Sequence, residues 1–162
     1  RGNFYYYFKT KDDILDAVIE ARLSETRAML DQWERDARTP ADRIRAFVHI
    51  LIANRADIKR FGCPVGTLNT ELSKLDHGSR AEAAVLFTLF RSWLSKQFTL
   101  LGRKQDADAL AMHVLAMSQG VATLANTFHD DKFIAREVRL MNDWLATIAD
   151  GEAPASRPTR VN

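Results

Sequence analysis

The sequence lacks several features that would place it outside the ordinary globular class. A single cysteine, Cys63, excludes an internal disulfide and fits a reducing compartment, so we expect a cytoplasmic protein. The apolar run from Phe47 to Ala53 is interrupted at His49 and is far shorter than the roughly 20 residues of a membrane span. No signal peptide is recognisable. Because the chain opens Arg-Gly-Asn-Phe-Tyr without an initiator methionine, we expect its natural start to lie upstream.

The sequence also lacks the spacings of the common catalytic and metal-binding motifs. No His-x-x-x-His, Glu-x-x-His or Gly-x-Ser-x-Gly pattern occurs, and no glycine-rich loop could cradle a phosphate. The histidines are scattered at positions 49, 77, 113 and 129. The acids beside His77 and His129 lie at expected helix ends, where capping explains them. We therefore expect no catalytic activity, no metal and no cofactor.

The composition itself is that of one folded domain. Of the 162 residues, 46% are hydrophobic and 27% are charged, which is ordinary for a globular protein. The net charge of +2 is too small to indicate a partner. Its distribution says more, because Arg1, Lys9 and Lys11 place three positive charges and no acid in the first eleven residues.

Helical periodicity runs through the chain, so an all-α fold is expected. Thr10 with Asp13 makes a capping box that opens a long helix to about Arg38. Thr39 and Pro40 then open a second helix, whose buried stripe is expected to reach Ile58. Further helices are predicted at about 65–75, 79–102, 106–128 and 131–149, followed by a mobile tail over 151–162.

The last two predicted helices have apolar residues around much of their circumference. Their periodicity fits the core of a single chain equally well as a two-fold four-helix bundle made with a second copy. The bundle would place at its homodimer interface the residues Val114, Val121, Ala122, Val138, Met141 and Leu145.

The first eleven residues combine tyrosines and lysines at a helix end. Such groups position a protein on phosphates, although Phe4 and Phe8, four residues apart, are typical of a core. The stretch Gly-Asn-Phe-Tyr-Tyr-Tyr-Phe-Lys-Thr-Lys resembles the end of the helix-turn-helix in TetR-type repressors. Every defined position of that pattern matches, namely Gly2, Phe4, Tyr5, Tyr7, Phe8, Thr10 and Lys11. A weaker resemblance to one subset of the family lies at Gly62-Cys63-Pro64-Val65-Gly66.

The resemblance implies a TetR-type helical bundle that works as a homodimeric repressor on operator DNA, with no membrane partner. Residues 1–9 would end a truncated helix-turn-helix, and residues 10–150 would form the ligand-binding and dimerisation domain. Tyr5, Tyr6 and Lys11 would reach operator phosphates, Gly2 would lie close to the DNA, and Arg1 is the one possible base-reading residue. Because the rest of the DNA-binding domain lies upstream, residues 1–162 are expected to bind operator DNA weakly or not at all.

The resemblance also implies that a small effector binds inside the helical body, and we expect this effector to be apolar or aromatic. Aromatic and apolar residues of the middle helices suit a pocket wall, although most such residues are core. His113 and Asn126 are candidate polar anchors, with a purely structural role as the alternative. The expected apolar contacts are Phe47, Leu51, Phe90, Trp93 and Met117.

Cys63 supports an alternative mechanism. It precedes Pro64 at what looks like a helix start, near Lys59 and Arg60, where positive potential favours a thiolate. Such a thiolate could sense electrophiles or oxidants, whereas the alternative is a small apolar residue filling a tight turn. A helical dimerisation module without any ligand is the third possibility.

Overall fold

The computed structural model describes residues 10–63, 65–67 and 79–151, and throughout these ranges the regular structure is helical, without strands. The expected all-α fold is confirmed. The helices are α2 (Lys11–Asp36), α3 (Pro40–Ala53), α4 (Arg55–Phe61), α6 (Ser79–Leu100), α7 (Ala107–Phe128) and α8 (Asp131–Ala149). None of these helices is long and apolar enough to cross a membrane.

Local capping explains where three of these helices begin. The Thr10 hydroxyl accepts from the Asp13 amide at 3.1 Å, and the Thr10 amide donates to the Asp13 carboxylate at 2.8 Å. Thr39 caps α3 in the same way, accepting from the Asp42 amide at 3.1 Å. Asp130 caps α8 by accepting from the Lys132 amide at 2.8 Å. The starts predicted at Thr10 and Thr39 are therefore confirmed, as is the start predicted at about residue 131.

One predicted helix is two helices in the structure. The expectation of a single helix from Thr39 to Ile58 is wrong, because the backbone leaves the helical region at Asn54, with φ −102° and ψ 16°. The chain changes direction there, and α4 carries Ile58 against α7. Of the helix expected at 65–75, residues 65–67 are helical and the others lie outside the described residues. Residues 1–9 and 152–162, with the domain and tail predicted for them, also lie outside.

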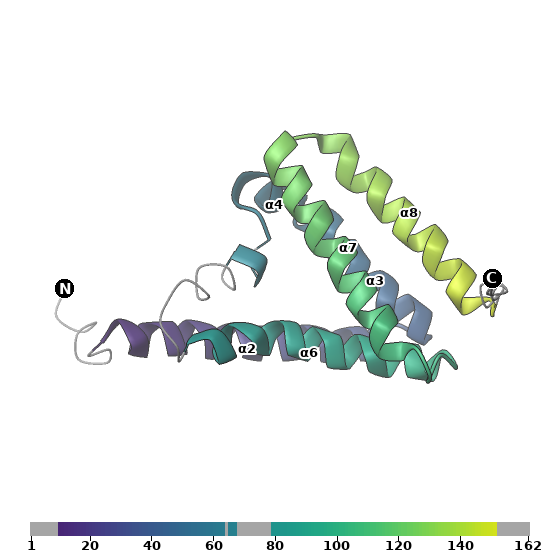
Figure 1. The fold of residues 1–162 in the computed structure, drawn as a ribbon, viewed down its shortest axis with the longest axis horizontal. Coiled ribbons are helices and arrows are strands. Elements are labelled where there is room, and N and C mark those ends of the chain that lie inside the picture. Colours follow the sequence, from purple (N-terminus) through teal and green to yellow (C-terminus); the bar gives the residue numbers. More distant parts are fainter. Residues whose placement is uncertain (1–9, 64, 68–78, 152–162) are drawn as a thin grey trace, which may run out of the picture.

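The helices form two groups that meet at an angle (Figure 1). α2 and α6 lie side by side along one edge of the molecule, and α2 extends toward the N-terminal end. α3, α7 and α8 rise from this pair, with α3 packed against both α6 and α8 and with α7 packed against α6, α8 and α4. α7 therefore connects the two groups.

The core has a large and a small cluster of buried side chains. The large cluster is centred on fully buried residues of α3, α6 and α8, such as Ile44, Phe98 and Leu145. The small cluster joins α2 to α6 through Ile19, Leu23 and Leu86. Two partly buried residues, Val65 and Leu89, pack against both clusters. The junction between the clusters is where the candidate site lies.

The six residues expected at a homodimer interface belong to the large cluster. Their side chains are at most 6% exposed within one chain. They are Val114, Val121, Ala122, Val138, Met141 and Leu145, and they complete the core of one chain.

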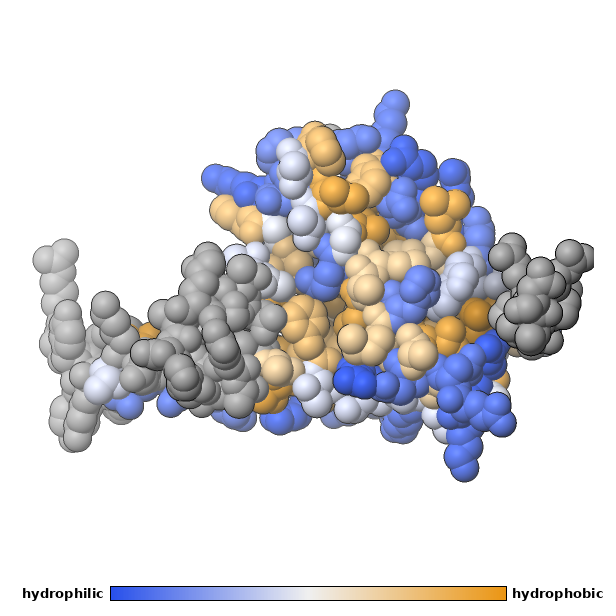
Figure 2. Space-filling model, in the orientation of Figure 1, coloured by the Kyte–Doolittle hydropathy of each residue, from blue (hydrophilic) through white to orange (hydrophobic). Residues whose placement is uncertain are grey.

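The outer face of α7 carries no charge after its first turn. Figure 2 views the molecule from this side, and apolar and neutral side chains gather along the helix. Asp108, in the first turn, is the one charged residue of α7. The exposed residues at intervals of four form a row that we call the α7 stripe: Met112, Ala116, Gly120, Leu124 and Phe128.

Candidate functional site

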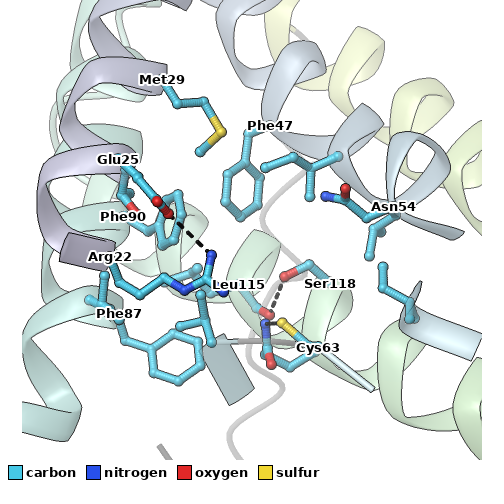
Figure 3. A pocket seen from close by; sticks show the side chains of 17 residues that line it. Arg22, Glu25, Met29, Phe47, Asn54, Cys63, Phe87, Phe90, Leu115 and Ser118 are labelled. Carbon is cyan, nitrogen blue, oxygen red and sulfur yellow. Dashed lines mark hydrogen bonds and ion pairs between the residues drawn. The ribbon is translucent and has the colours of Figure 1, made fainter. Parts of the chain in front are cut away.

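A cavity of about 200 Å³ lies between α2, α3, α4, α6 and α7 (Figure 3). Its walls are mainly apolar. Phe47 and Phe90 meet edge to face, with their ring centroids 5.3 Å apart, and Leu115 projects from α7. Of the residues expected to contact an effector, Phe47, Leu51 and Phe90 line this cavity. A mainly apolar, partly open cavity of this kind suits a small apolar molecule.

α2 supplies the polar edge of the cavity through Arg22, Glu25 and Thr26. Arg22 and Glu25 form an ion pair of 3.2 Å, in which both side chains are more than half exposed. Thr26 lines the cavity and is only 7% exposed. Within the described part of the chain, its hydroxyl has no hydrogen-bond partner. Because no side chain or backbone group of this part holds the hydroxyl, it is available to a ligand.

Cys63 reaches the cavity from the segment that follows α4. It is half-buried, and the Gln119 side-chain amide donates to its sulfur at 3.5 Å. The end of the Gln119 side chain occupies the space beside Gly66, so a larger residue there would require that flexible side chain to move. The expected placement of Cys63 in a turn fits the structure, since Gly62 ends α4 with φ +79°.

The C-terminal end of α2 is held by a polar cluster, which we call the α2 anchor: Glu34, Arg43, Lys96 and Gln97. Lys96 donates to the Glu34 carboxylate at 2.9 Å, and the fully buried Gln97 donates to it at 3.2 Å. Arg43 donates to the Gln97 side chain and to the backbone oxygens of Glu34 and Ala37, each at 3.3 Å. These bonds join α2, α3 and α6.

The anchor also changes the acidity of Glu34. Its pKa lies below the ordinary value of 4.5, chiefly because Lys96 donates a hydrogen bond to the carboxylate. The charges of Lys96 and Arg43 act in the same direction, and partial burial opposes them. Glu34 is thus held in its ionised form.

The other residues expected to contact an effector lie outside the cavity wall. Trp93 packs against Trp33 at 5.7 Å between centroids, and Met117 packs against the large cluster. His113 is exposed and lies edge to face with Trp144. Asn126 donates to the backbone oxygen of Lys59 at 3.1 Å and so ties α7 to α4. These residues have structural contacts in place of the expected ligand contacts.

The contribution of α2 to the cavity was missed by the sequence analysis. One signal was present, because Thr26 occupies the gap between Leu23 and Leu30 in the buried stripe of that helix. A polar residue on a buried stripe indicates either a hydrogen bond or a cavity. The expected DNA contacts Arg1, Gly2, Tyr5 and Tyr6 lie outside the described residues, as does the side chain of Lys11. Among the residues described, no three His, Cys, Asp or Glu side chains are grouped to hold a metal ion.

Comparison with known proteins identifies the class of this chain. The chain is a transcriptional regulator rather than an enzyme: residues 40–137 match a family model described as the C-terminal domain of LmrA/YxaF-like transcriptional regulators. That match covers α3, α4, α6, α7 and the first part of α8. The chain belongs to the TetR family, as the motif at its N-terminus predicted.

Two curated relatives agree with this assignment. An HTH-type transcriptional regulator in the lacX 3′ region of Lactococcus lactis subsp. lactis is 29% identical over 136 residues, which are 80% of this chain and 68% of that protein. The transcriptional regulator AcuR of Cereibacter sphaeroides is 32% identical over 122 residues, which are 68% of this chain and 54% of that protein. The similarity thus spans between half and about two thirds of the relatives' lengths.

Proposed function

We propose that this chain is the effector-binding and dimerisation part of a DNA-binding repressor, which a small apolar or aromatic molecule releases from its operator. The observation that carries the proposal is the cavity lined by α2. This helix begins beside the segment that resembles the end of a recognition helix, and its far end is held by the α2 anchor. A ligand that displaces the middle of α2 would move its free end.

The size of the cavity defines the effector class. An apolar cavity of about 150 Å³ holds a benzene molecule, so about 200 Å³ admits a single substituted ring or a short branched chain. The Thr26 hydroxyl supplies one hydrogen bond to a polar substituent. The existence of this cavity favours an effector-responsive regulator over a helical module without a ligand.

Phenol is a suitable probe of the cavity, and isothermal calorimetry measures its binding. In Leu115→Trp the larger side chain fills the space, so binding is expected to disappear while the helical circular dichroism is retained. Leu100→Trp is the matched control, because Leu100 is exposed and lies outside the cavity. Equal phenol affinity in the two variants would show that the cavity is not the ligand site.

The release of DNA needs a separate measurement. The operator is obtained by selection of the full-length protein on a random duplex library, and ligands that bind the cavity are then added to the complex. Linkage requires that a ligand that weakens operator binding is itself bound more weakly, by the same factor, when operator is present. A cavity ligand that leaves operator affinity unchanged at saturation would contradict effector-controlled release.

We also propose that the homodimer forms through the α7 stripe. An uncharged row with small residues at its centre lets two helices approach closely, and exposed Leu124 and Phe128 supply apolar area. Nothing lies within 4 Å of the position where a Cβ would stand at Gly120, so the stripe is open at that point. The two copies would then present their N-terminal ends to one palindromic site.

A further inference from the structure

A second concave region of the surface, separate from the effector cavity, is lined by basic side chains. We call it the basic hollow. Its volume is about 430 Å³, and the described residues that line it are Arg55, Ala56, Lys59, Arg60 and His129. None of these five is acidic, and none lines the effector cavity. The basic hollow therefore concentrates positive charge at a place that the proposed function does not use.

The sequence of α4 places three of these side chains on one face of the helix. Arg55 and Lys59 are four residues apart and Arg60 follows directly, so the three lie on the same side. Ile58 lies on the opposite side, is only 2% exposed and packs in the large cluster. Like charges four residues apart repel each other, and a bound anion would relieve this repulsion.

Two hydrogen bonds hold the walls of the basic hollow in place. Asn126 of α7 donates to the Lys59 backbone oxygen at 3.1 Å, which fixes α4 against the end of α7. The His129 amide donates to the Ala125 oxygen at 3.0 Å, and His129 ends α7 with φ 53°. This left-handed backbone is uncommon for residues other than glycine. Here it carries an imidazole that lines the hollow.

The two arginines have no acidic partner among the described residues. Arg60 lies over the Phe61 ring, with its guanidinium carbon 5.0 Å from the centroid. Within this part of the chain, no ion pair joins either arginine to Asp57, the one acid of α4. Asp130, which follows His129, accepts a backbone amide at the start of α8 at 2.8 Å. Both guanidinium groups are therefore free to bind an anion from outside the chain.

We propose that the basic hollow binds a phosphate monoester of a small organic molecule. Such a group carries about two negative charges at pH 7 and three acceptor oxygens. Guanidinium groups bind phosphate oxygens through paired N–H donors, so Arg55 and Arg60 donate to the phosphate. Lys59 adds a third positive charge, and the imidazole of His129 donates from the other wall. This site lies outside the effector cavity and goes beyond the proposed function.

The surroundings of the basic hollow favour a small ligand over a nucleic acid. Cations that bind the DNA backbone neutralise successive phosphates along it, whereas these side chains converge on one hollow. Phe61 and Phe128, adjacent in sequence to Arg60 and His129, are 62% and 73% exposed. Exposed rings suit the organic part of a ligand better than a charged strand. A monocarboxylate would neutralise only one of the three permanent positive charges, so a phosphate group fits better.

The test uses the full chain with phenyl phosphate as the probe and isothermal calorimetry at low ionic strength. We expect saturable binding of one molecule per chain, which weakens as salt is added. Arg55→Gln and Arg60→Gln should each weaken binding on the order of tenfold, because each removes a charged donor. Arg139→Gln is the matched control, since Arg139 is exposed on α8 outside the hollow, and it should change the affinity less than about twofold. Absence of saturable binding, or an equal loss in Arg55→Gln and Arg139→Gln, would overturn the proposal.

His129→Gly tests the imidazole without disturbing the end of α7. Glycine adopts the left-handed backbone readily, so the midpoint of urea unfolding should not fall. Phenyl phosphate should bind about 2–5-fold more weakly, because one hydrogen bond is lost. Undiminished affinity in this variant would refute the role of His129.

Leu115→Trp separates the basic hollow from the effector cavity. This variant fills the cavity, so phenol binding should disappear while phenyl phosphate binding stays unchanged. Loss of phenyl phosphate binding in this variant would place that ligand in the cavity and contradict the proposal. Failure of phenol to bind the unaltered chain counts against the proposed function alone.

A DNA duplex of about 20 base pairs tests the nucleic-acid alternative. If the basic hollow takes a phosphate monoester, Arg55→Gln should weaken phenyl phosphate binding more than duplex binding. The reverse order would assign the hollow to a nucleic-acid surface and would sink the proposal.

Discussion

The hydroxyl of Thr26 is the polar atom that distinguishes the cavity from ordinary core. It occupies a buried stripe of α2 where leucine or valine would pack without leaving a polar atom unpaired. Within the described part of the chain this hydroxyl makes no hydrogen bond, so under the proposed function it can bind a polar group of the effector.

Thr26→Val removes that hydroxyl and keeps the shape of the side chain. We expect the free energy of unfolding of the ligand-free protein to change by less than about 1 kcal/mol, because no hydrogen bond within the fold is lost. Phenol should bind about 2–10-fold more weakly, which corresponds to one lost hydrogen bond, while toluene should bind as before. Urea unfolding and calorimetry measure the two effects.

The control for this substitution is Thr88→Val, on the exposed side of α6. Its free energy of unfolding should change by less than about 0.5 kcal/mol. A loss of more than about 1 kcal/mol in Thr26→Val would mean that the hydroxyl stabilises the fold and is not reserved for a ligand.

Individual residues were the least predictable part of the site. Phe47, Leu51 and Phe90 could be assigned to the cavity because they are apolar and central, but the same reasoning selected Trp93 and Met117, which pack in the core. A periodic pattern reveals which face of a helix is buried. It does not reveal whether that face meets another side chain or an empty space, because this depends on residues distant in the sequence.

Helical elements were predicted more reliably, since caps are local. Thr10, Thr39 and Pro40 mark helix starts through bonds to residues within one turn. The break at Asn54 has no such signal, because the bonds from Asn54 to Ile50 and from Ile58 to Asn54 continue across it. Packing of α4 against α7 sets the new direction there, and the Asn126 bond to Lys59 holds it.

The α2 anchor predicts how stability depends on pH. Since the pKa of Glu34 is lowered in the folded chain, its contribution is present above the ordinary value of 4.5 and disappears as pH falls through the lowered pKa. Glu34→Gln should cost about 1 kcal/mol at pH 7, and this difference from the unaltered chain should shrink below about pH 4.

Urea unfolding between pH 7 and pH 3 checks this expectation. Glu20→Gln removes one negative charge from an exposed position of the same helix, 3.8 Å from Arg27, and serves as the control. If the difference caused by Glu34→Gln stays constant down to pH 3, the carboxylate is not what anchors α2.

On the scale of the whole molecule, the residues expected at a homodimer interface are buried within one chain. Val114 and Val138 have the periodicity of an interface, yet they face the core of their own chain. Their spacing could not distinguish burial in the core of one chain from burial against a second copy. A helix buried on several sides has the same apolar pattern in either case. Exposed Leu124 and Phe128 carry the apolar area that a partner could cover.

Leu124→Glu tests the α7 stripe. A charge there should weaken self-association at least tenfold, because each copy would bury an unpaired carboxylate against the other. Leu100→Glu is the matched control, since Leu100 is also an exposed leucine but lies at the end of α6. Sedimentation equilibrium gives both dissociation constants, and an equal effect of the two substitutions would exclude the stripe as the interface.

Because one end of α2 is anchored, a small displacement in the middle of the helix would become a larger displacement at its other end. At 1.5 Å per residue, Thr26 lies about 12 Å along the helix from Glu34, whereas Lys11 lies about 35 Å from it. If α2 pivots at Glu34, a displacement of about 1 Å at Thr26 becomes about 3 Å at Lys11. The helix contains neither proline nor glycine between these points, so it has the stiffness that such amplification needs. Under the proposed function, a ligand no larger than one ring would thereby change the spacing of the two DNA-binding ends in a homodimer.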